Sequence, residues 1–289
     1  MRLLLILTMI LWNTPLSYAA ERESRLSAMV ALVSQDENAA TFLRNPGKGY
    51  IEAYMMFDSA LGKDVIMGLD LEMIEGIENP HFIKGGDWMA FVGVQRTGVL
   101  WVATGTDDTL RGKPSRDRKW ETISLGSQLK PLTWYRLRVE ADFSHRRFLK
   151  FSIESADMKK TVDLSGYLLD YPNYMPFNKG FMSYYVHAMR GKALMAPEDK
   201  NASARVYFDD VEGGAISNTG QNIPIFKDGF ESLAPITGQP VTLPVVDLDR
   251  YVQGQWYLER EESLATMEAL PNTHSGKAVG IVDARLSDE

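Results

Sequence analysis

The chain has 289 residues, and its 31 Lys and Arg side chains against 38 Asp and Glu side chains give a formal net charge of −7. This acidic balance repels phosphate backbones and argues against nucleic-acid binding. The sequence contains no Cys, which excludes disulfides, thiolate metal sites and cysteine nucleophiles. Stability must therefore come from burial of apolar surface, for which the chain is long enough.

The first 20 residues have the layout of a secretory signal. Arg2 gives a positive start, residues 3–12 form an apolar run, Pro15 interrupts it, and Ala19 and Ala20 are small residues at a cleavage position. The run is about half of the roughly 20 apolar residues that a membrane span needs, so it favours a cleaved signal over an anchor helix. We expect a periplasmic or secreted protein with no transmembrane segment after cleavage.

Strand patterns dominate the rest of the chain. Short runs alternate apolar and polar residues or are apolar throughout, and Gly, Asn, Asp and Pro separate them. The runs are residues 49–57, 64–74, 88–94, 99–104, 134–142, 148–154 and 204–211. This pattern predicts an all-β protein, built as a sandwich or a barrel. The polar stretch 107–119 and the aromatic-rich stretch 166–187 are predicted to be loops.

The C-terminal part contains an internal echo of the N-terminal part. Residues 26–32 and 264–270 share Leu, Met, Ala and Leu at the same spacing, and similarity at a fixed offset is typical of repeated units. We therefore divide the chain into a signal peptide (1–20), a β-sandwich (21–213), a linker (214–224) and a C-terminal β segment (225–289). That last segment is either a partial repeat or a strand that complements the first domain.

Three motifs carry a resemblance to a known fold family. They are KDGFES at 227–232, followed by Trp256 and HSGKAV at 274–279; WYRLRV at 134–139, followed by Asp142; and VYFDDV at 206–211. In this order they resemble the concanavalin A-like, laminin G-like jelly-roll domains of secreted bacterial proteins. The resemblance implies a jelly-roll sandwich of two antiparallel sheets. Because that family includes sugar-binding modules, polysaccharide lyases and glycoside hydrolases, it does not select one function.

The same resemblance implies a structural calcium ion. In related modules an acid of the opening motif and an acid of the closing strand share the ion, and calcium prefers several carboxylate and carbonyl oxygens. The residues that match are Asp209, Asp210, Asp228 and Glu231. The alternative is that these carboxylates form hydrogen bonds with a neighbouring turn.

Asp70 and Glu72 form an acidic pair within a predicted strand. Residues two apart in a strand share a face, so the two carboxyl groups are neighbours. One group of glucanases in the resembling family displays its acids in this way, with carboxyl groups about 5 Å apart for a retaining reaction. That motif has its nucleophile where this chain has Gly68. We expect solvated strand carboxylates rather than a hydrolase.

Aromatic side chains provide the candidates for ligand binding. Tyr171, Tyr174 and Tyr184 are predicted to line a sugar-binding surface, since flat rings stack on sugar rings; the alternative is that they pin their loop to the core. Trp88, Trp101 and Trp134 lie in apolar strands and are predicted to be core residues.

One local cluster has the residue types of a polysaccharide lyase, which needs a base and a cationic group. It consists of Tyr184 or Tyr185 with His187 and Arg190. The leading hypothesis is nevertheless an exported protein that binds a carbohydrate or a surface polymer. The alternatives are a polysaccharide lyase or glycoside hydrolase, and a structural or adhesive envelope protein.

Overall fold

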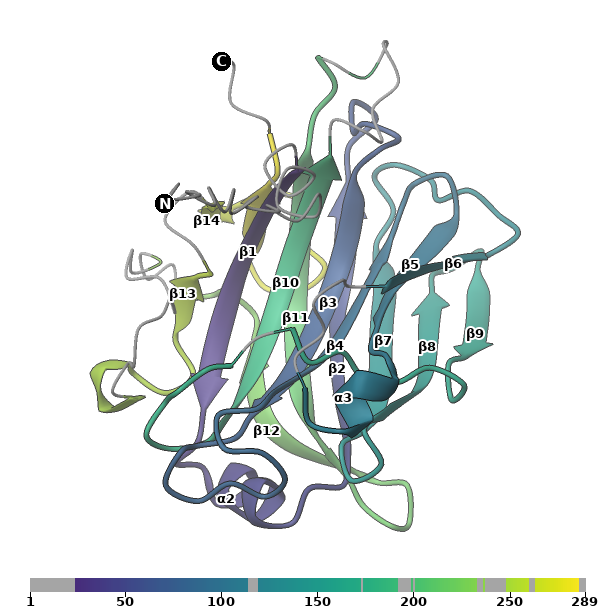
Figure 1. Cartoon of the computed structure of the whole chain (residues 1–289). Coiled ribbons are helices and arrows are strands. Elements are labelled where there is room, and N and C mark those ends of the chain that lie inside the picture. The colour runs from purple at the N-terminus through teal and green to yellow at the C-terminus, as the bar shows by residue number, and fades with distance from the viewer. Residues whose placement is uncertain are drawn as a thin grey trace, which may run out of the picture.

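The computed structural model describes residues 24–113, 119–172, 174–191, 199, 201–232, 236, 248–259 and 263–285. The expected signal peptide lies outside these residues. The protein is a jelly-roll sandwich of two antiparallel sheets (Figure 1), as the sequence predicts. Among the described residues, no helix has the length and apolar character needed to cross a membrane.

Sheet A has seven strands in the order β13-β1-β10-β3-β4-β5-β6. Their bounds are β1 Ser24–Val33, β3 Ile66–Ile74, β4 Asp87–Val94, β5 Val99–Thr104, β6 Lys119–Ser124, β10 Phe181–Gly191 and β13 Trp256–Leu258. The centre of the sheet pairs strands from distant parts of the sequence, since β10 lies between β1 and β3.

Sheet B has eight strands in the order β14-β15-β11-β2-β7-β8-β9, and β12 also pairs with β11. Their bounds are β2 Lys48–Phe57, β7 Tyr135–Asp142, β8 Arg147–Glu154, β9 Lys159–Asp163, β11 Arg205–Ile216, β12 Asn222–Asp228, β14 Leu264–Ala269 and β15 Ala278–Asp283. The seven alternating or apolar runs of the sequence all fall on strands of the two sheets.

The main core fills the space between the sheets. Alternate side chains of facing strands meet there, for example Leu71 of β3 with Ile51 of β2 and Val139 of β7 as members of one buried cluster. Burying each such side chain stabilises the fold by about 2 kcal/mol. Because alternate residues point to opposite faces, the same strands present their remaining side chains on the outer faces.

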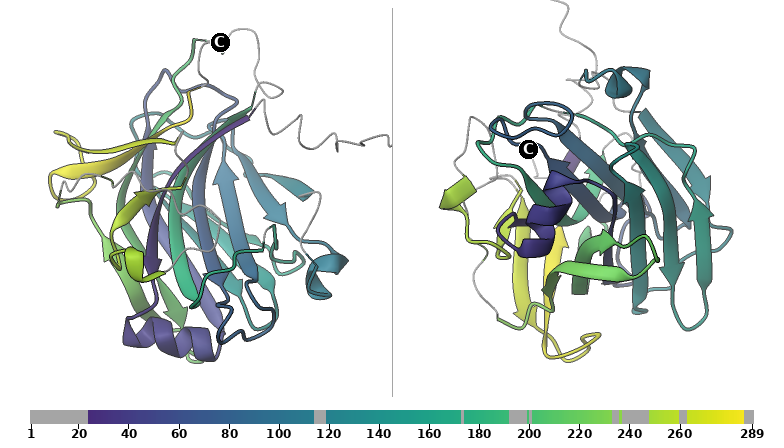
Figure 2. Two further views of the ribbon diagram at one scale, coloured as in Figure 1. Left: turned by 60° about the vertical axis from the view of Figure 1, so that its left-hand side comes forward. Right: turned by 90° about the horizontal axis from the view of Figure 1, so that it is seen from below.

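The short helices lie at the margins of the sandwich. Helix α2 (Glu37–Arg44) begins after Asp36, whose carboxylate accepts the backbone N–H groups of Asn38 and Ala39 and so caps the helix. It buries Ala39 and Phe42 and covers one end of the sandwich (Figure 2). The other helical segments are α3 (Asp107–Leu110), within the stretch predicted to be a loop, and the single turn η3 (Leu248–Arg250).

The prediction of a loop at 166–187 is wrong for its last part, because residues from Phe181 onward form β10 at the centre of sheet A. Its side chains are buried on both faces of the sheet. A strand buried on both faces shows no alternation of apolar and polar residues, and in β10 Ser183, His187 and Arg190 also interrupt the apolar run. The sequence FMSYYVHAMRG therefore lacked the periodic signal that marked the other strands.

The C-terminal segment belongs to the same sandwich. Residues 214–224, predicted to be a linker, instead form the end of β11, a turn and the start of β12, and the two strands pair in antiparallel fashion. Strand β13 adds an edge to β1 in sheet A, and β15 pairs with β11 in sheet B. Residues after 225 therefore contribute strands to both sheets.

Candidate functional site: the outer face of sheet A

The acidic pair lies at the centre of the outer face of sheet A. Asp70 and Glu72 point away from the core, yet only 3% and 6% of their surface is exposed. On one side, β10 places Tyr185 opposite Asp70 and Ser183 opposite Glu72. On the other side, β4 places Phe91 opposite Asp70. Two carboxyl groups thus lie between a row of hydroxyl groups and an apolar strand.

Burial changes the protonation of this pair. Loss of solvation raises the pKa of Glu72 to about 7, although hydrogen bonds with Tyr185, Ser183 and Asp70 oppose the increase. The Ser183 hydroxyl donates to Glu72 Oε2 at 3.0 Å. Glu72 therefore changes its protonation state near neutral pH.

Tyr185 supplies a hydroxyl donor at this site. Burial raises its pKa, and the nearby charges of Glu72, Asp87 and Asp70 raise it further. The phenol is thus protonated throughout the physiological range. It offers a hydrogen-bond donor next to carboxyl oxygens that accept.

A row of aromatic rings continues across the same face. His187 of β10 stacks on Phe91 of β4, with ring centroids 3.9 Å apart and planes at 20°. Phe91 meets Trp120 of β6 edge to face at 5.5 Å, and Trp120 meets Trp101 of β5 at 6.0 Å. Trp101 is only partly buried, and its indole N–H has no acceptor among the described residues. The prediction that Trp101 is a core residue is therefore wrong.

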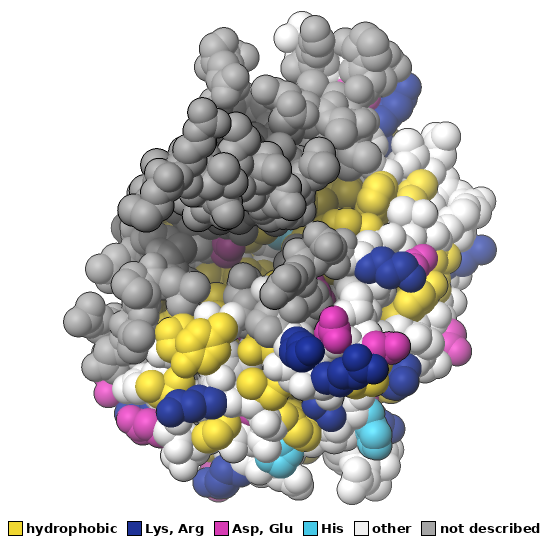
Figure 3. Space-filling model, in the orientation of Figure 1, with side chains coloured by type: hydrophobic (Ala, Val, Ile, Leu, Met, Phe, Trp, Pro, Cys, Tyr) yellow, Lys and Arg dark blue, Asp and Glu magenta, His cyan; other side chains and the backbone are white. Residues whose placement is uncertain are grey.

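We call this surface the acid-aromatic face. It consists of Asp70, Glu72, Phe91, Trp101, Trp120, Ser183, Tyr185 and His187. Figure 3 views the molecule from this side, and hydrophobic side chains show between the parts that are not described. Sequence reasoning identified Asp70 and Glu72 as neighbours, but it missed the row of Phe91, Trp101 and Trp120. Alternation within β4 and β5 puts Phe91 and Trp101 on an outer face, but only strand pairing shows that it is the same face.

Glycine at position 68 is required by the close approach of two strands. A Cβ atom at Gly68 would lie 2.2 Å from the backbone oxygen of Val92 on β4. The same oxygen accepts a hydrogen bond from Nε2 of His187 at 3.1 Å. A third acid at this position, as in the glucanase motif, would force β3 and β4 apart.

The structure separates the residues of the predicted lyase cluster. Tyr184 lies in the core between the sheets with no exposed surface, and its ring stacks on Phe226 at 5.4 Å. Arg190 is buried, pairs with Asp64 at 2.7 Å and donates to backbone carbonyls. His187 lies on the opposite face of β10 from Tyr184, because the two are an odd number of residues apart. Only Tyr185 and His187 share the outer face.

The other predicted ligand-binding tyrosines differ in exposure. Tyr171 is 2% exposed and packs against Trp88, a fully buried core residue as predicted. Tyr174 is 48% exposed. Of Tyr171, Tyr174 and Tyr184, only Tyr174 is therefore open to solvent.

Three of the four predicted calcium ligands bind one turn, residues 274–278. Asp209 Oδ2 accepts the backbone N–H groups of His274 and Ser275, each at 2.9 Å. Asp210 Oδ2 lies 2.8 Å from Nδ1 of His274. Glu231 Oε1 accepts the backbone N–H groups of residues 277 and 278. The strands β11 and β15 are thus joined through carboxylates as well as through the sheet.

Asp228, the fourth predicted ligand, accepts a hydrogen bond from the Trp256 indole at 2.5 Å. Among the described residues, the ligand atoms of Asp209, Asp210 and His274 lie within 4.8 Å of one another, which is close enough for them to hold a metal ion. Burial raises the pKa of Asp209, while the backbone hydrogen bonds oppose this. The hydrogen bonds of Asp209, Asp210 and Glu231 to the turn match the alternative to calcium binding that the sequence left open. A structural calcium ion stays a prediction.

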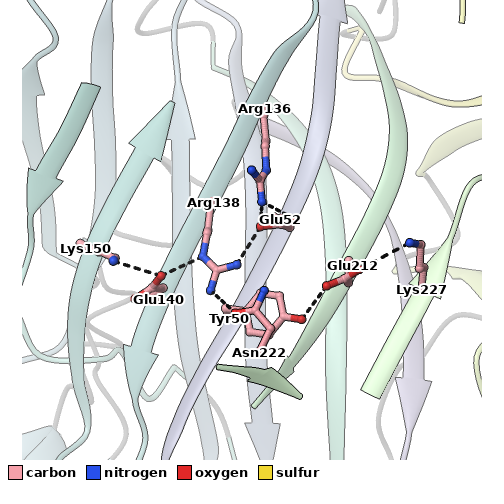
Figure 4. Close-up of polar contacts among 9 residues, drawn as sticks. All are labelled: Tyr50, Glu52, Arg136, Arg138, Glu140, Lys150, Glu212, Asn222 and Lys227. Carbon is pink, nitrogen blue, oxygen red and sulfur yellow. Dashed lines mark hydrogen bonds and ion pairs between the residues drawn. The ribbon is translucent and has the colours of Figure 1, made fainter. Parts of the chain in front are cut away.

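The outer face of sheet B carries a network of paired charges (Figure 4). Glu52 binds Arg136 and Arg138 at 2.7 Å each, and Arg138 also lies over the ring of Tyr50. Tyr50 donates to Glu212 at 2.7 Å, and burial raises its pKa. The remaining contacts join Glu140 to Arg138 and Lys150, Glu212 to Lys227, and Arg138 to Asn222. Each carboxylate here already has a cationic partner, so we place the candidate site on sheet A.

Comparison with protein-family models and with curated proteins finds no match. Among solved structures, the chain is similar to scytalido-glutamic peptidase, with 10% identity and a TM-score of 0.37 over 90% of this chain and 98% of that one. It is similar to the PL-14 alginate lyase from Aplysia kurodai, with 7% identity and a TM-score of 0.30 over 50% and 70%. It is also similar to peanut lectin, with 12% identity and a TM-score of 0.27 over 57% of this chain and 78% of that one. We draw no functional conclusion from similarities at this level.

Proposed function

We propose that the protein is exported and binds a glycan or a glycan-bearing surface polymer on the acid-aromatic face. The observation that carries the proposal is the pair of partly exposed rings, Trp101 and Trp120, which extend the face from the buried Phe91 and from the carboxyl and hydroxyl groups of Asp70, Glu72 and Tyr185. Aromatic faces stack on sugar rings, and convergent polar groups fix the orientation of a ligand. The order of the sequence motifs and the jelly-roll sandwich support placing the chain among concanavalin A-like modules.

The charge of this face favours a neutral sugar. The carboxyl groups of Asp70 and Glu72 are central to it, and they would repel a uronate carboxylate. A lyase would also need a cationic group beside that carboxylate, whereas Arg190 is held by Asp64. These observations therefore support a binding site on this face better than a lyase active site.

The spacing of the acids also favours binding over hydrolysis. A retaining glycosidase holds its two carboxyl groups about 5 Å apart, and an inverting enzyme holds them further apart. Asp70 and Glu72 are hydrogen-bonded to each other instead. Gly68 stands where the glucanase motif has its nucleophile, and the strands leave no space for a larger residue there.

Binding is tested with the mature chain, residues 21–289, on a glycan array, followed by calorimetric titration of each positive glycan. We expect Trp101→Ala and Trp120→Ala to weaken binding about tenfold or more, as loss of a stacked ring does. Trp134→Ala is the matched control, because Trp134 packs against His274 at sheet B. Absence of binding to every glycan, or equal weakening by all three substitutions, would refute the proposal.

A further inference from the structure

An open surface cavity of about 360 Å³ lies away from the acid-aromatic face, where the connection from β6 to β7 meets the β8–β9 hairpin, and most of its lining side chains are exposed. Its volume falls in the range of small-molecule sites, about 300–1,000 Å³. The lining includes the hydroxyl groups of Ser127, Thr133 and Ser155 and the ammonium groups of Lys130 and Lys160. No sequence motif marks this place, because its walls come from two separate turns.

Three contacts order the walls of the cavity. Lys130 Nζ pairs with Asp157 Oδ2 at 2.7 Å, which joins the β6–β7 connection to the hairpin. The backbone N–H of Lys130 donates to the Tyr135 hydroxyl at 2.7 Å, and Tyr135 is only 2% exposed. The Ser155 N–H donates to the Met158 carbonyl at 2.7 Å and closes the hairpin turn. The two backbone hydrogen bonds thus order each wall separately, and an exposed ion pair joins the walls.

The lining is positively charged within an acidic protein. Lys130, Lys159 and Lys160 contribute three positive charges and Asp157 one negative charge, which leaves 3 − 1 = 2 positive charges. Lys130 is paired with Asp157, and Lys159 with Glu154 at 3.1 Å. Lys160 has no carboxylate partner among the described residues. Its ammonium group lies 4.0 Å from where a Cβ atom at Gly126 would be, so it stands beside the other wall.

We propose that this cavity binds an anionic sugar residue, one that carries a carboxylate or a sulfate group. Lys160 pairs with the anion, and the hydroxyl groups of Ser127, Thr133 and Ser155 exchange hydrogen bonds with the sugar hydroxyls. Charge-assisted hydrogen bonds of this kind are stronger than neutral ones. Because the cavity lies apart from the acid-aromatic face, its test does not depend on the function proposed for that face.

The test uses ¹⁵N–¹H spectra of the mature chain titrated with glucuronate, glucose 6-sulfate and glucose. We expect saturable shifts of the backbone signals of Ser127, Ser155 and Lys160 with one or both anionic sugars, which also tells carboxylate from sulfate. Glucose should produce no such shifts. Lys160→Gln should weaken binding about tenfold, Lys160→Arg should retain it, and Lys48→Gln, at an exposed position on β2, should leave it unchanged.

Three results would overturn the proposal. Equal affinity for glucose and for the anionic sugars would show that charge plays no part. Equal weakening by Lys160→Gln and Lys48→Gln would indicate general attraction to a surface. Shifts that do not saturate, or that are absent from the cavity residues, would place any binding elsewhere.

Discussion

The protonation of Glu72 leads to a quantitative prediction for Glu72→Gln. The carboxyl group has a pKa of about 7 in the folded protein, against 4.5 for an unperturbed group. Between these values the folded state keeps a proton that the unfolded state has lost. The stability of the wild type therefore falls as the pH rises through this window. Gln has the shape of the protonated acid and does not titrate.

The expected size follows from the two values. At about 1.4 kcal/mol per pH unit, the difference corresponds to about 3 kcal/mol of unfolding free energy. The free energy of unfolding of Glu72→Gln minus that of the wild type should thus increase by about 3 kcal/mol between about pH 4 and about pH 8. The remaining acids, Asp70 included, are present in both proteins.

Urea unfolding at a series of pH values measures this difference. Glu78→Gln is the matched control, because it removes one exposed carboxyl group in the same way. The reasoning fails if the gap between the wild type and Glu72→Gln is the same at both ends of the range. It also fails if the gap changes in the opposite direction.

The remaining predictions concern buried contacts. Arg190→Met leaves the buried carboxylate of Asp64 without its guanidinium and should lower the free energy of unfolding, measured by thermal denaturation, by about 3–5 kcal/mol. Arg111→Met changes an exposed side chain and should have little effect. Similar melting temperatures for the two variants would contradict this prediction. Gly68→Ala should cost about 1–3 kcal/mol through overpacking, and Gly166→Ala, with no atom within 4 Å, should be tolerated. If calcium binds at Asp209 and Asp210, chelation should lower the melting temperature, and no response to calcium or chelator would remove that site.

The local sequence was sufficient to predict features that depend on a single strand. Alternation predicted β2, β7 and β8, and it also showed that Asp70 and Glu72 share a face. The same rule places Tyr184 and His187 on opposite faces once a strand is assigned there. The strand itself was not apparent, because β10 is buried on both sides and has no alternation.

Tertiary structure alone decided what surrounds the acidic pair. Strand pairing brings Tyr185 opposite Asp70 across more than a hundred residues of sequence, and it aligns Phe91, Trp120 and Trp101 on one face. A shift of one residue in any of these registers would turn the side chains to the other face. The sequence by itself thus determined the all-β class, the acidic pair and seven of the strands, namely β2, β3, β4, β5, β7, β8 and β11. The sheet order, the acid-aromatic face and the lysine-lined cavity depend on contacts between distant segments, which local periodicity does not encode.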